Sequence, residues 1–456
     1  MSYFERLKEG GNYLIQQLKQ ASPYQKRLDA ISRILRILRP LRIPSSWQAN
    51  NASSKSNSYF CKPLTVGLIA LFSAAISSPA VEPEDILIHP VGPVTFYPRL
   101  ALSGTFNDNI FYREFDKKTD YITRILPGLR ARIGRSPYRN FTLTYDLTQS
   151  LYANNSQQDA TDQVGSLISH LEGNRLSWDG NDRISYLTSI LSSSSSSSGL
   201  DADLEGGQKE NRFIISDNHR LSYDLREKLD LYGQFRHTAI EFESGARFNN
   251  RRTFRGTLGS QYDYSEKTGF LGEVYLGQDQ STPNANISPE QRADYLGAVL
   301  GATGEFTRRL SGSIRFGYEW RRFTNNQPDA NGMVVSVALQ HRLSARTFTE
   351  LAYDRSNNLS TSSSGNYVSD RVTLTIRQII GNSGKLSAFA RGAFDHRAYS
   401  GPRLDTSTTA GGGLSYDFYM WLRGDLAYNF QMLDSNEARR FDYKVNRVTL
   451  SLSAGF

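Results

Sequence analysis

Residues 310–321 read LSGSIRFGYEWR, and this stretch decides the fold class. Apolar residues and one glycine hold the even positions from Leu310 to Trp320, while serine, arginine, glycine and glutamate hold the odd positions. In a β-strand the two sets face opposite sides of the sheet. The even set suits lipid, with its aromatic residues near one end of the segment, and the odd set suits water. The pattern predicts a strand that crosses a membrane.

The same alternation recurs along the chain, clearly in residues 141–148, 254–264 and 422–432 and poorly in 164–176 and 209–216. Short turns are expected at eight places: Ser136-Pro137, Asp179-Gly180, Arg226-Glu227, Glu266-Lys267, Arg308-Arg309, Ser344-Ala345, Asn382-Ser383 and Tyr419-Met420. Nine longer polar stretches separate them, at about 112–120, 153–163, 191–210, 243–250, 278–292, 324–331, 355–368, 397–410 and 433–441. Short turns on one side and long loops on the other are typical of outer-membrane barrels.

These connections predict an all-β protein, a transmembrane antiparallel up-and-down barrel of about eighteen strands of the outer-membrane type. Hydrocarbon offers no partner for an unpaired strand edge, so the sheet has to close. Closure is expected between a strand near 98–110 and the last one, 445–456. A barrel of this size encloses a lumen that side chains cannot fill.

The composition argues against a nucleic-acid-binding protein, although the net charge is +8. Of the 53 Lys and Arg and 45 Asp and Glu, residues 1–62 hold 11 and 3, and residues 63–80 hold none. The remaining chain has 42 of each and is formally neutral, so no basic surface is expected on the folded part. Hydrophobic content is only 38%, which also excludes a bundle of membrane-spanning helices.

The first 96 residues divide into three expected segments. Residues 1–62 form a basic N-terminal extension, and 63–80 form the apolar region of a secretory signal peptide with cleavage after Ala80. Residues 81–96 then form a short periplasmic segment, and 97–456 form the barrel. The alternative for 63–80 is an uncleaved anchor.

The chain ends on Phe456, on the same face as Val448, Leu450 and Leu452. An alternating strand that ends in an aromatic residue resembles the C-terminal signal that the barrel assembly machinery recognises. We therefore expect export to the outer membrane of a Gram-negative type of cell, with outer-membrane lipid as the surroundings of the barrel.

The expected opening hairpin carries four short motifs: YPRL at 97–100, FNDNIF at 106–111, DYIT at 120–123 and ILPGL at 125–129. Together they resemble the putative β-barrel porin 2 family, whose first strand ends in N-D-N-I/V-F and whose second carries P-G-L. Members of that family are linked to exopolysaccharide secretion. The resemblance implies a polymer-exporting porin and no catalytic residues. The motifs also have a purely structural interpretation, in which Asn107 and Asn109 shape the strand end and Gly128 eases a bend.

No motif for catalysis or cofactor binding is present in the sequence. The histidines are scattered, no HExxH or GxSxG motif occurs, and the Gly411-Gly412-Gly413 run enters an expected strand rather than a helix. We expect no enzyme activity, no cofactor and no metal site.

The alternation assigns ten arginines to the lumen. They are Arg124, Arg130, Arg132, Arg255, Arg315, Arg321, Arg377, Arg391, Arg423 and Arg447. Six acids share that face: Asp146, Asp263, Glu273, Glu319, Asp395 and Asp425. Fixed charge sets the selectivity of a pore, so this set favours anions. The alternative is that the arginines pair with acids across strands and only brace the barrel.

The sequence therefore predicts an outer-membrane porin that passes an exopolysaccharide, with an acidic polymer as one candidate, through an arginine-rich aqueous lumen. Its expected partners are a periplasmic polysaccharide-export protein and the polysaccharide itself. The alternatives are a general or substrate-specific diffusion porin and a structural or adhesin barrel.

Overall fold

The computed structural model describes residues 88–136, 138–190, 207, 209–243, 248–282, 290–324, 329–360, 366–436 and 442–455. The expected N-terminal extension 1–62, the signal region 63–80 and Phe456 lie outside the described residues. Within the described chain, no helix is long and apolar enough to cross a membrane.

The described residues form nineteen strands and one short 3-10 helix. The elements are β1 (His89–Val91), β2 (Val94–Asn107), β3 (Asp120–Ser136), β4 (Arg139–Tyr152), η1 (Ser156–Gln158), β5 (Ala160–Glu172), β6 (Leu176–Leu187), β7 (Arg212–Arg226), β8 (Leu229–Phe242), β9 (Asn250–Ser265), β10 (Thr268–Thr282), β11 (Gln291–Thr307), β12 (Leu310–Phe323), β13 (Gly332–Arg342), β14 (Thr347–Leu359), β15 (Asn366–Ile380), β16 (Leu386–Tyr399), β17 (Leu404–Tyr419), β18 (Leu422–Ser435) and β19 (Tyr443–Ala454).

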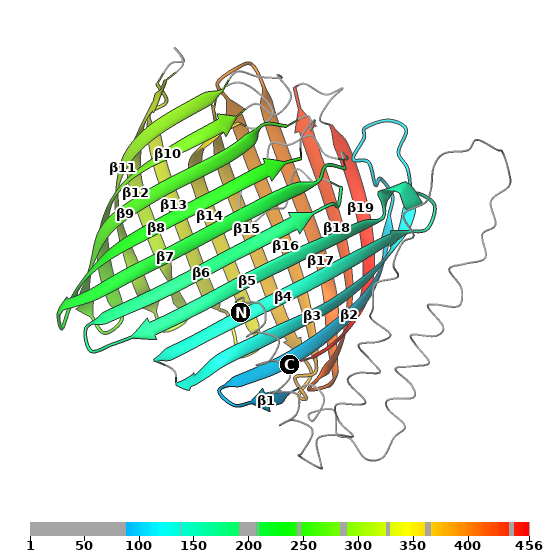
Figure 1. The fold of residues 1–456 in the computed structure, drawn as a ribbon, viewed down its shortest axis with the longest axis horizontal. Helices are drawn as coiled ribbons and strands as arrows, with labels where there is room; N and C mark the ends of the chain where they lie inside the picture. Colours follow the sequence, from blue (N-terminus) through cyan, green and yellow to red (C-terminus); the bar gives the residue numbers. More distant parts are fainter. Residues whose placement is uncertain are drawn as a thin grey trace, which may run out of the picture. The chain divides into compact units, whose positions relative to one another are not determined.

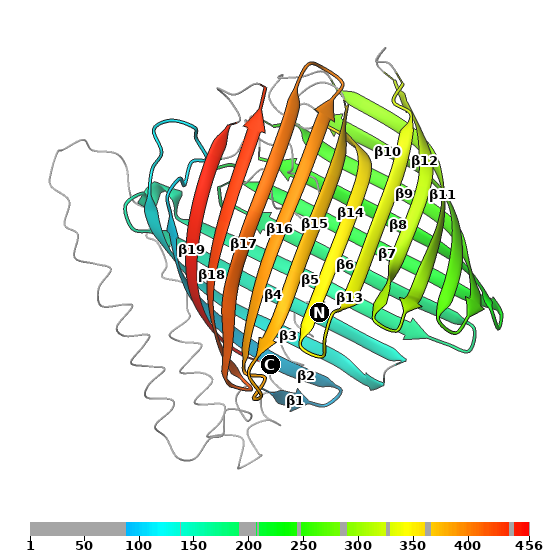
Figure 2. The same ribbon diagram turned by 180° about the vertical axis from the view of Figure 1, so that it is seen from behind.

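Strands β2 to β19 form a closed antiparallel barrel of eighteen strands (Figures 1 and 2). Each strand pairs with the next along the chain, and β19 returns to β2, with Arg447 opposite Asn107 and Ala454 opposite Leu100. Beyond that point β1 continues the pairing on the same edge of β2, as His89 lies opposite Phe96. The predicted fold class, strand number and closing pair are confirmed. The barrel begins at Val94, three residues before the expected start.

Strand β12 shows how the sequence sets the two faces of the wall. Phe316 and Trp320 expose 56% and 48% of their surface on the outside, whereas Glu319 and Arg321 expose 5% and 3% on the inside. Apolar side chains can face hydrocarbon without loss, and charged side chains need water or a partner. The alternation predicted for residues 310–321 is therefore confirmed.

Seven of the eight predicted short turns fall between strands, and the turn at Asp179-Gly180 is wrong. Both residues lie inside β6, and the chain turns instead between Glu172 and Leu176. An Asp-Gly pair is a strong local turn signal. Here the pairing of β6 with its neighbours places Gly180 opposite Ser169, and the turn falls at residues 173–175.

Several strands run further toward the long loops than the sequence indicated. The expected loops 278–292, 355–368 and 397–410 shrink because β10, β14 and β16 continue to Thr282, Leu359 and Tyr399. Most of the residues in these extensions are polar, so the lipid-facing alternation fades there. Backbone hydrogen bonds continue the sheet regardless of the side chains, and the barrel wall extends past the apolar band.

Candidate pore lining

All ten predicted lumen arginines lie on the inner face of the barrel wall. Each arginine alternates along its strand with exposed apolar residues, so its side chain points to the opposite side of the wall. Arg255 follows the exposed Phe254, and Arg447 precedes the exposed Val448. The alternation of strand side chains requires this once the outer face is fixed. Their function as pore lining stays a prediction.

Five of the six predicted lumen acids each contact an arginine. The pairs are Arg99–Asp146, Arg315–Glu273 at 3.3 Å, Arg321–Glu319 at 3.1 Å, Arg397–Asp395 at 2.7 Å and Arg423–Asp425 at 3.0 Å. The sixth, Asp263, accepts a hydrogen bond from Gln261 at 3.1 Å. Ion pairing across or along strands is thus a real feature of this wall, and it involves three of the ten predicted arginines.

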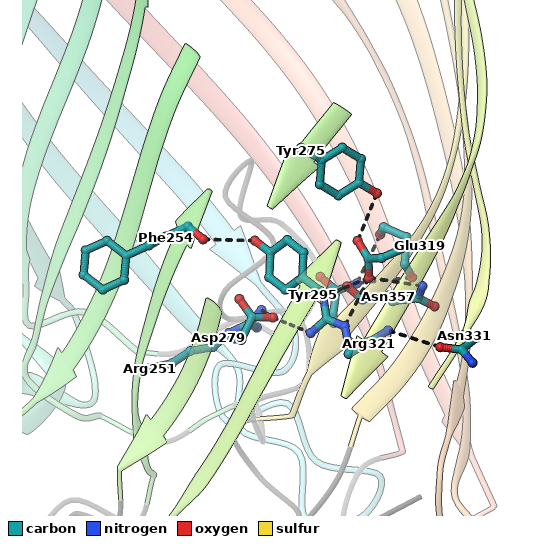
Figure 3. Close-up of polar contacts among 11 residues, drawn as sticks. Arg251, Phe254, Tyr275, Asp279, Tyr295, Glu319, Arg321, Asn331 and Asn357 are labelled. Atoms are coloured by element: carbon teal, nitrogen blue, oxygen red, sulfur yellow. Dashed lines mark hydrogen bonds and ion pairs between the residues drawn. The ribbon is translucent and has the colours of Figure 1, made fainter. Parts of the chain in front are cut away.

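A buried charge cluster lies on the inner face of β9 to β12 (Figure 3). Arg321 is its centre: its Nη1 donates to Asp279 Oδ2 at 2.5 Å and its Nε donates to Glu319 Oε1 at 3.1 Å. Tyr275 donates its hydroxyl proton to Glu319 Oε2 at 3.1 Å. Both acids and the arginine are almost wholly buried.

Two aromatic rings shield this cluster. The guanidinium of Arg321 lies 4.6 Å from the ring centre of Tyr295, and that of Arg255 lies 3.5 Å from the ring centre of Tyr275. Guanidinium groups stack favourably on aromatic faces. Arg255 and Arg321 are therefore held by the wall, and for them the bracing alternative is the better explanation.

Four other predicted arginines form a second group, which we call the open arginines: Arg130, Arg132, Arg377 and Arg391. Within the part of the chain that the structure describes, none of them has a hydrogen bond or an ion pair. Arg132, Arg377 and Arg391 are exposed, and Arg130 is half-buried. All four lie within six residues of the short-turn end of β3, β15 or β16.

The remaining two arginines bind neutral groups. Arg124 donates to Thr105 Oγ1 at 3.1 Å, and Arg447 donates to Gln431 Oε1 at 2.7 Å and to the Tyr112 hydroxyl at 3.4 Å. These contacts position the side chains without neutralising their charge.

The sequence analysis missed several inward acids, most of them near strand ends. Asp224 lies opposite Asp230 between β7 and β8, and both line a cleft of about 430 Å³ at the short-turn end together with Asp263. Glu350 and Asp354 on β14 also face inward. The alternation would have revealed them, had it been followed to the last residue of each strand. The inner face thus carries more acids than predicted, and also further arginines such as Arg99 and Arg397. The open arginines are a local feature of this face.

The N-D-N motif of the first hairpin closes the barrel. Asn446 of β19 donates from its backbone N to Asp108 Oδ1 at 2.7 Å and from Nδ2 to Asp108 Oδ2 at 2.6 Å. Asn109, wholly buried, donates from Nδ2 to the carbonyl oxygens of Arg113 and Lys444. The motif is therefore structural, as the alternative interpretation held.

Gly128 lies where a side chain would collide with an ion pair, while the expected bend stays a prediction. A Cβ at this position would lie 2.4 Å from Asp146 Oδ1 and 2.6 Å from Arg99 Nε. The missing side chain makes room for the Arg99–Asp146 ion pair on the inner face.

Among the described residues, no group of three or more His, Cys, Asp or Glu is placed to hold a metal ion.

A closed barrel with an apolar outer face and a charged inner face defines the class: a porin-like β-barrel of the outer membrane. Residues 296–456 match the family described as putative beta-barrel porin 2. The predicted resemblance to this family is confirmed over the last nine strands, while the opening hairpin that suggested it lies outside the matched range. No curated protein matches the chain.

Several solved structures are similar to this chain at low identity and low TM-score. OccK3 (OpdO) of Pseudomonas aeruginosa is 12% identical, with 79% of this chain and 96% of that chain covered and a TM-score of 0.43. OccAB3 of Acinetobacter baumannii is 11% identical over 79% and 99%, with a TM-score of 0.42. OccK2 (OpdF) of Pseudomonas aeruginosa, solved with glucuronate, is 11% identical over 79% and 98%, also with a TM-score of 0.42.

Proposed function

We propose that this chain forms an aqueous diffusion channel of the outer membrane that favours anionic solutes. The observation that carries the proposal is the exposure of Arg132, Arg377 and Arg391, which point into the barrel and yet are open to solvent. Side chains that filled the lumen would bury one another. Exposed inward side chains instead indicate a space that water can occupy.

The charge preference follows from how the acids are used. The acids of the predicted set are tied to neighbouring arginines or to Gln261. The unpredicted inward acids Asp224 and Asp230 lie on β7 and β8, apart from β3, β15 and β16, which carry the open arginines. The open arginines therefore keep their charge available. Fixed charge along a pore attracts ions of the opposite sign. A guanidinium also binds a carboxylate through two parallel hydrogen bonds, so carboxylate-bearing solutes are the class best suited to these residues.

Planar-bilayer recordings of the purified full-length protein test the proposal. In a salt gradient the reversal potential should show anion preference. Replacing Arg130, Arg132, Arg377 and Arg391 together with Gln should move that potential toward zero or to cation preference. Replacing the same four with Lys keeps the charge and should preserve anion preference. Cation preference in the unaltered protein, or no response to the Gln replacements, would contradict the proposal.

Passage of an exopolysaccharide to the cell surface is a second candidate. It rests on the resemblance of the opening-hairpin motifs to a family whose members are linked to exopolysaccharide secretion. The match of residues 296–456 is to the description putative beta-barrel porin 2, which names no solute. The open arginines suit an acidic polymer for the same reason that they suit small carboxylates. In this case the chain would work with a periplasmic polysaccharide-export protein.

A deletion strain separates the two candidates. If the chain exports a polymer, deletion should remove surface polysaccharide, and the four-Gln variant should restore less of it at an equal amount of barrel. If the chain is a diffusion channel only, surface polysaccharide should be unchanged, while uptake of small carboxylates should slow.

A further inference from the structure

The outer face of β6, β7 and β8 carries four titratable residues, which we call the outer polar island: Asp182, Asp217, His219 and His237. Register places Asp217 opposite both Asp182 and His237. His219 lies opposite Phe235, whose exposed side chain marks the outer face. The island therefore points away from the lumen.

The four residues of the island lie in two close pairs, and His219 Nδ1 has no hydrogen-bond partner among the described residues. His219 Nε2 lies 3.0 Å from Asp182 Oδ1, and His237 Nδ1 lies 3.0 Å from Asp217 Oδ2. The four side chains remain 17–34% exposed on the outer surface. The ring of His237 also stacks on Phe254, with the ring centres 4.6 Å apart.

Apolar residues border the island toward both ends of the strands. Ile184 and Ile215 lie on the long-loop side, and Trp178 and Leu221 lie on the short-turn side. Asp182 lies six residues after the start of β6. In a tilted strand this corresponds to a height of about 15 Å along the barrel axis, within a lipid-facing apolar band about 25 Å tall. Ionisable side chains are rare at such depths and usually mark a function or a partner.

An apolar groove lies beside the island. Its volume is about 500 Å³, and Gly233 and Gly256 lie among its lining residues. A Cβ at Gly256 would meet no atom within 4 Å, so the space above it is empty. Leu258 and Leu276 protrude next to the groove, with 74% and 67% of their surface exposed.

We propose that this face, from the outer polar island to the glycine groove, binds a second copy of the same chain. A two-fold interface brings one surface patch against itself, so the patch must be self-complementary. This patch carries two carboxylates beside two imidazoles, so each charge type finds its counterpart in the same patch of the other copy. It also carries an apolar groove beside protruding leucines, which are apolar like the groove. A second copy would cover the polar atoms from lipid and fill the groove. The interface is independent of the solute that the lumen passes.

Cysteine cross-linking in isolated outer membranes tests the proposal with the full-length chain. Cys61, the single cysteine, is replaced with Ser. Leu221, Leu258 or Leu276 is then replaced with Cys in separate variants, and a short bifunctional thiol reagent is added. The controls are Val448, Leu450 and Leu452 replaced with Cys on the exposed outer face of β19. A cross-linked dimer at one or more of the first three positions, and at none of the controls, is the expected result.

A groove-filling substitution gives an independent test. Gly256→Leu should lower the cross-linked fraction at least tenfold. Gly392→Leu, an outward glycine of β16 with equally open space, should leave it unchanged. Heat-modifiable migration and channel conductance show whether each variant is folded. Dimers at the β19 positions, no dimer at any of the three, adducts to another protein, or an undiminished dimer in folded Gly256→Leu would overturn the proposal.

Discussion

Asp108, just after the first strand of the barrel, holds Asn446 in the last strand through two hydrogen bonds of 2.7 and 2.6 Å. The two residues are 338 positions apart in the chain. The contact therefore joins the ends of the sheet on the long-loop side, where β2 stops and β19 begins. Closure of the barrel depends on this seam because an open edge has no partner in lipid.

Replacing Asp108 with Ala should destabilise the folded barrel by about 1–3 kcal/mol, because two partly buried donors of Asn446 lose their acceptors. Equilibrium unfolding in lipid vesicles measures the change. Glu114→Ala, an exposed acid in the same loop, is the control and should have little effect. In a double-mutant cycle, Asp108→Ala and Asn446→Ala should be strongly non-additive; simple additivity would contradict the contact.

Replacing Arg321 with Met should lower the free energy of unfolding by about 3–5 kcal/mol, since the buried carboxylate of Glu319 loses its arginine and that of Asp279 keeps only the more distant Arg251, at 3.9 Å, among the described residues. The neighbouring Arg322→Met, exposed at the end of the strand, is the matched control. Adding Asp279→Asn and Glu319→Gln to Arg321→Met should recover part of the loss. If Arg321→Met costs no more than Arg322→Met, the cluster is hydrated rather than buried.

Arginine placed on the two faces of β12 should have unequal effects. Phe316→Arg puts a charge on the lipid-facing side and should cost about 2–4 kcal/mol, whereas Ser313→Arg points into the lumen and should cost far less. Reversible unfolding in lipid gives both values. Equal losses would show that the assigned faces are wrong.

Adding a single methyl group at Gly128 should destabilise the barrel by about 1–3 kcal/mol, because the new Cβ would overlap the Arg99–Asp146 pair. Gly104→Ala is the control, since a Cβ there meets nothing within 4 Å. Unfolding measurements on the two variants test the difference. A Gly128→Ala variant as stable as Gly104→Ala would mean that the ion pair can shift aside.

Much of the architecture could be predicted because a membrane barrel imposes a local rule at every residue. Each strand crosses an apolar band of lipid and has water or protein on its inner side. The positions of Phe316 and Arg315 in the alternating sequence are therefore enough to assign one to the lipid face and the other to the lumen face. Seven turns and the closing strand pair followed from the same pattern. The rule fails where the band ends, which is why the polar ends of β10 and β14 were expected to be loops. It also fails at Asp179-Gly180, where neighbouring strands override a local turn signal.

The candidate pore lining was predictable only in part. The sequence placed Arg255, Arg321 and Arg391 on the same face but could not distinguish them. Arg321 is held by Asp279 and Glu319, Arg255 by Tyr275, and within the described residues Arg391 by no hydrogen bond or ion pair. Pairs within one strand, such as Arg321 and Glu319, follow from the alternation. Pairs between strands, such as Arg321 and Asp279, depend on the register of one strand against another, which the sequence of a single strand does not give.

The sequence by itself determined the strands, their two faces and the need for closure. The reason is that apolar residues alternate with polar ones wherever a strand has lipid on one side and water on the other. Only the tertiary structure decided which charges on different strands neutralise one another, since Arg99 and Asp146 come from strands that are not neighbours in the chain. Pairs such as Arg423 and Asp425, two residues apart on one strand, already share a face in the sequence pattern. It also showed that Asp182, Asp217, His219 and His237 gather on the outside. Side chains from separate strands become neighbours only when hydrogen bonding between strands fixes their register.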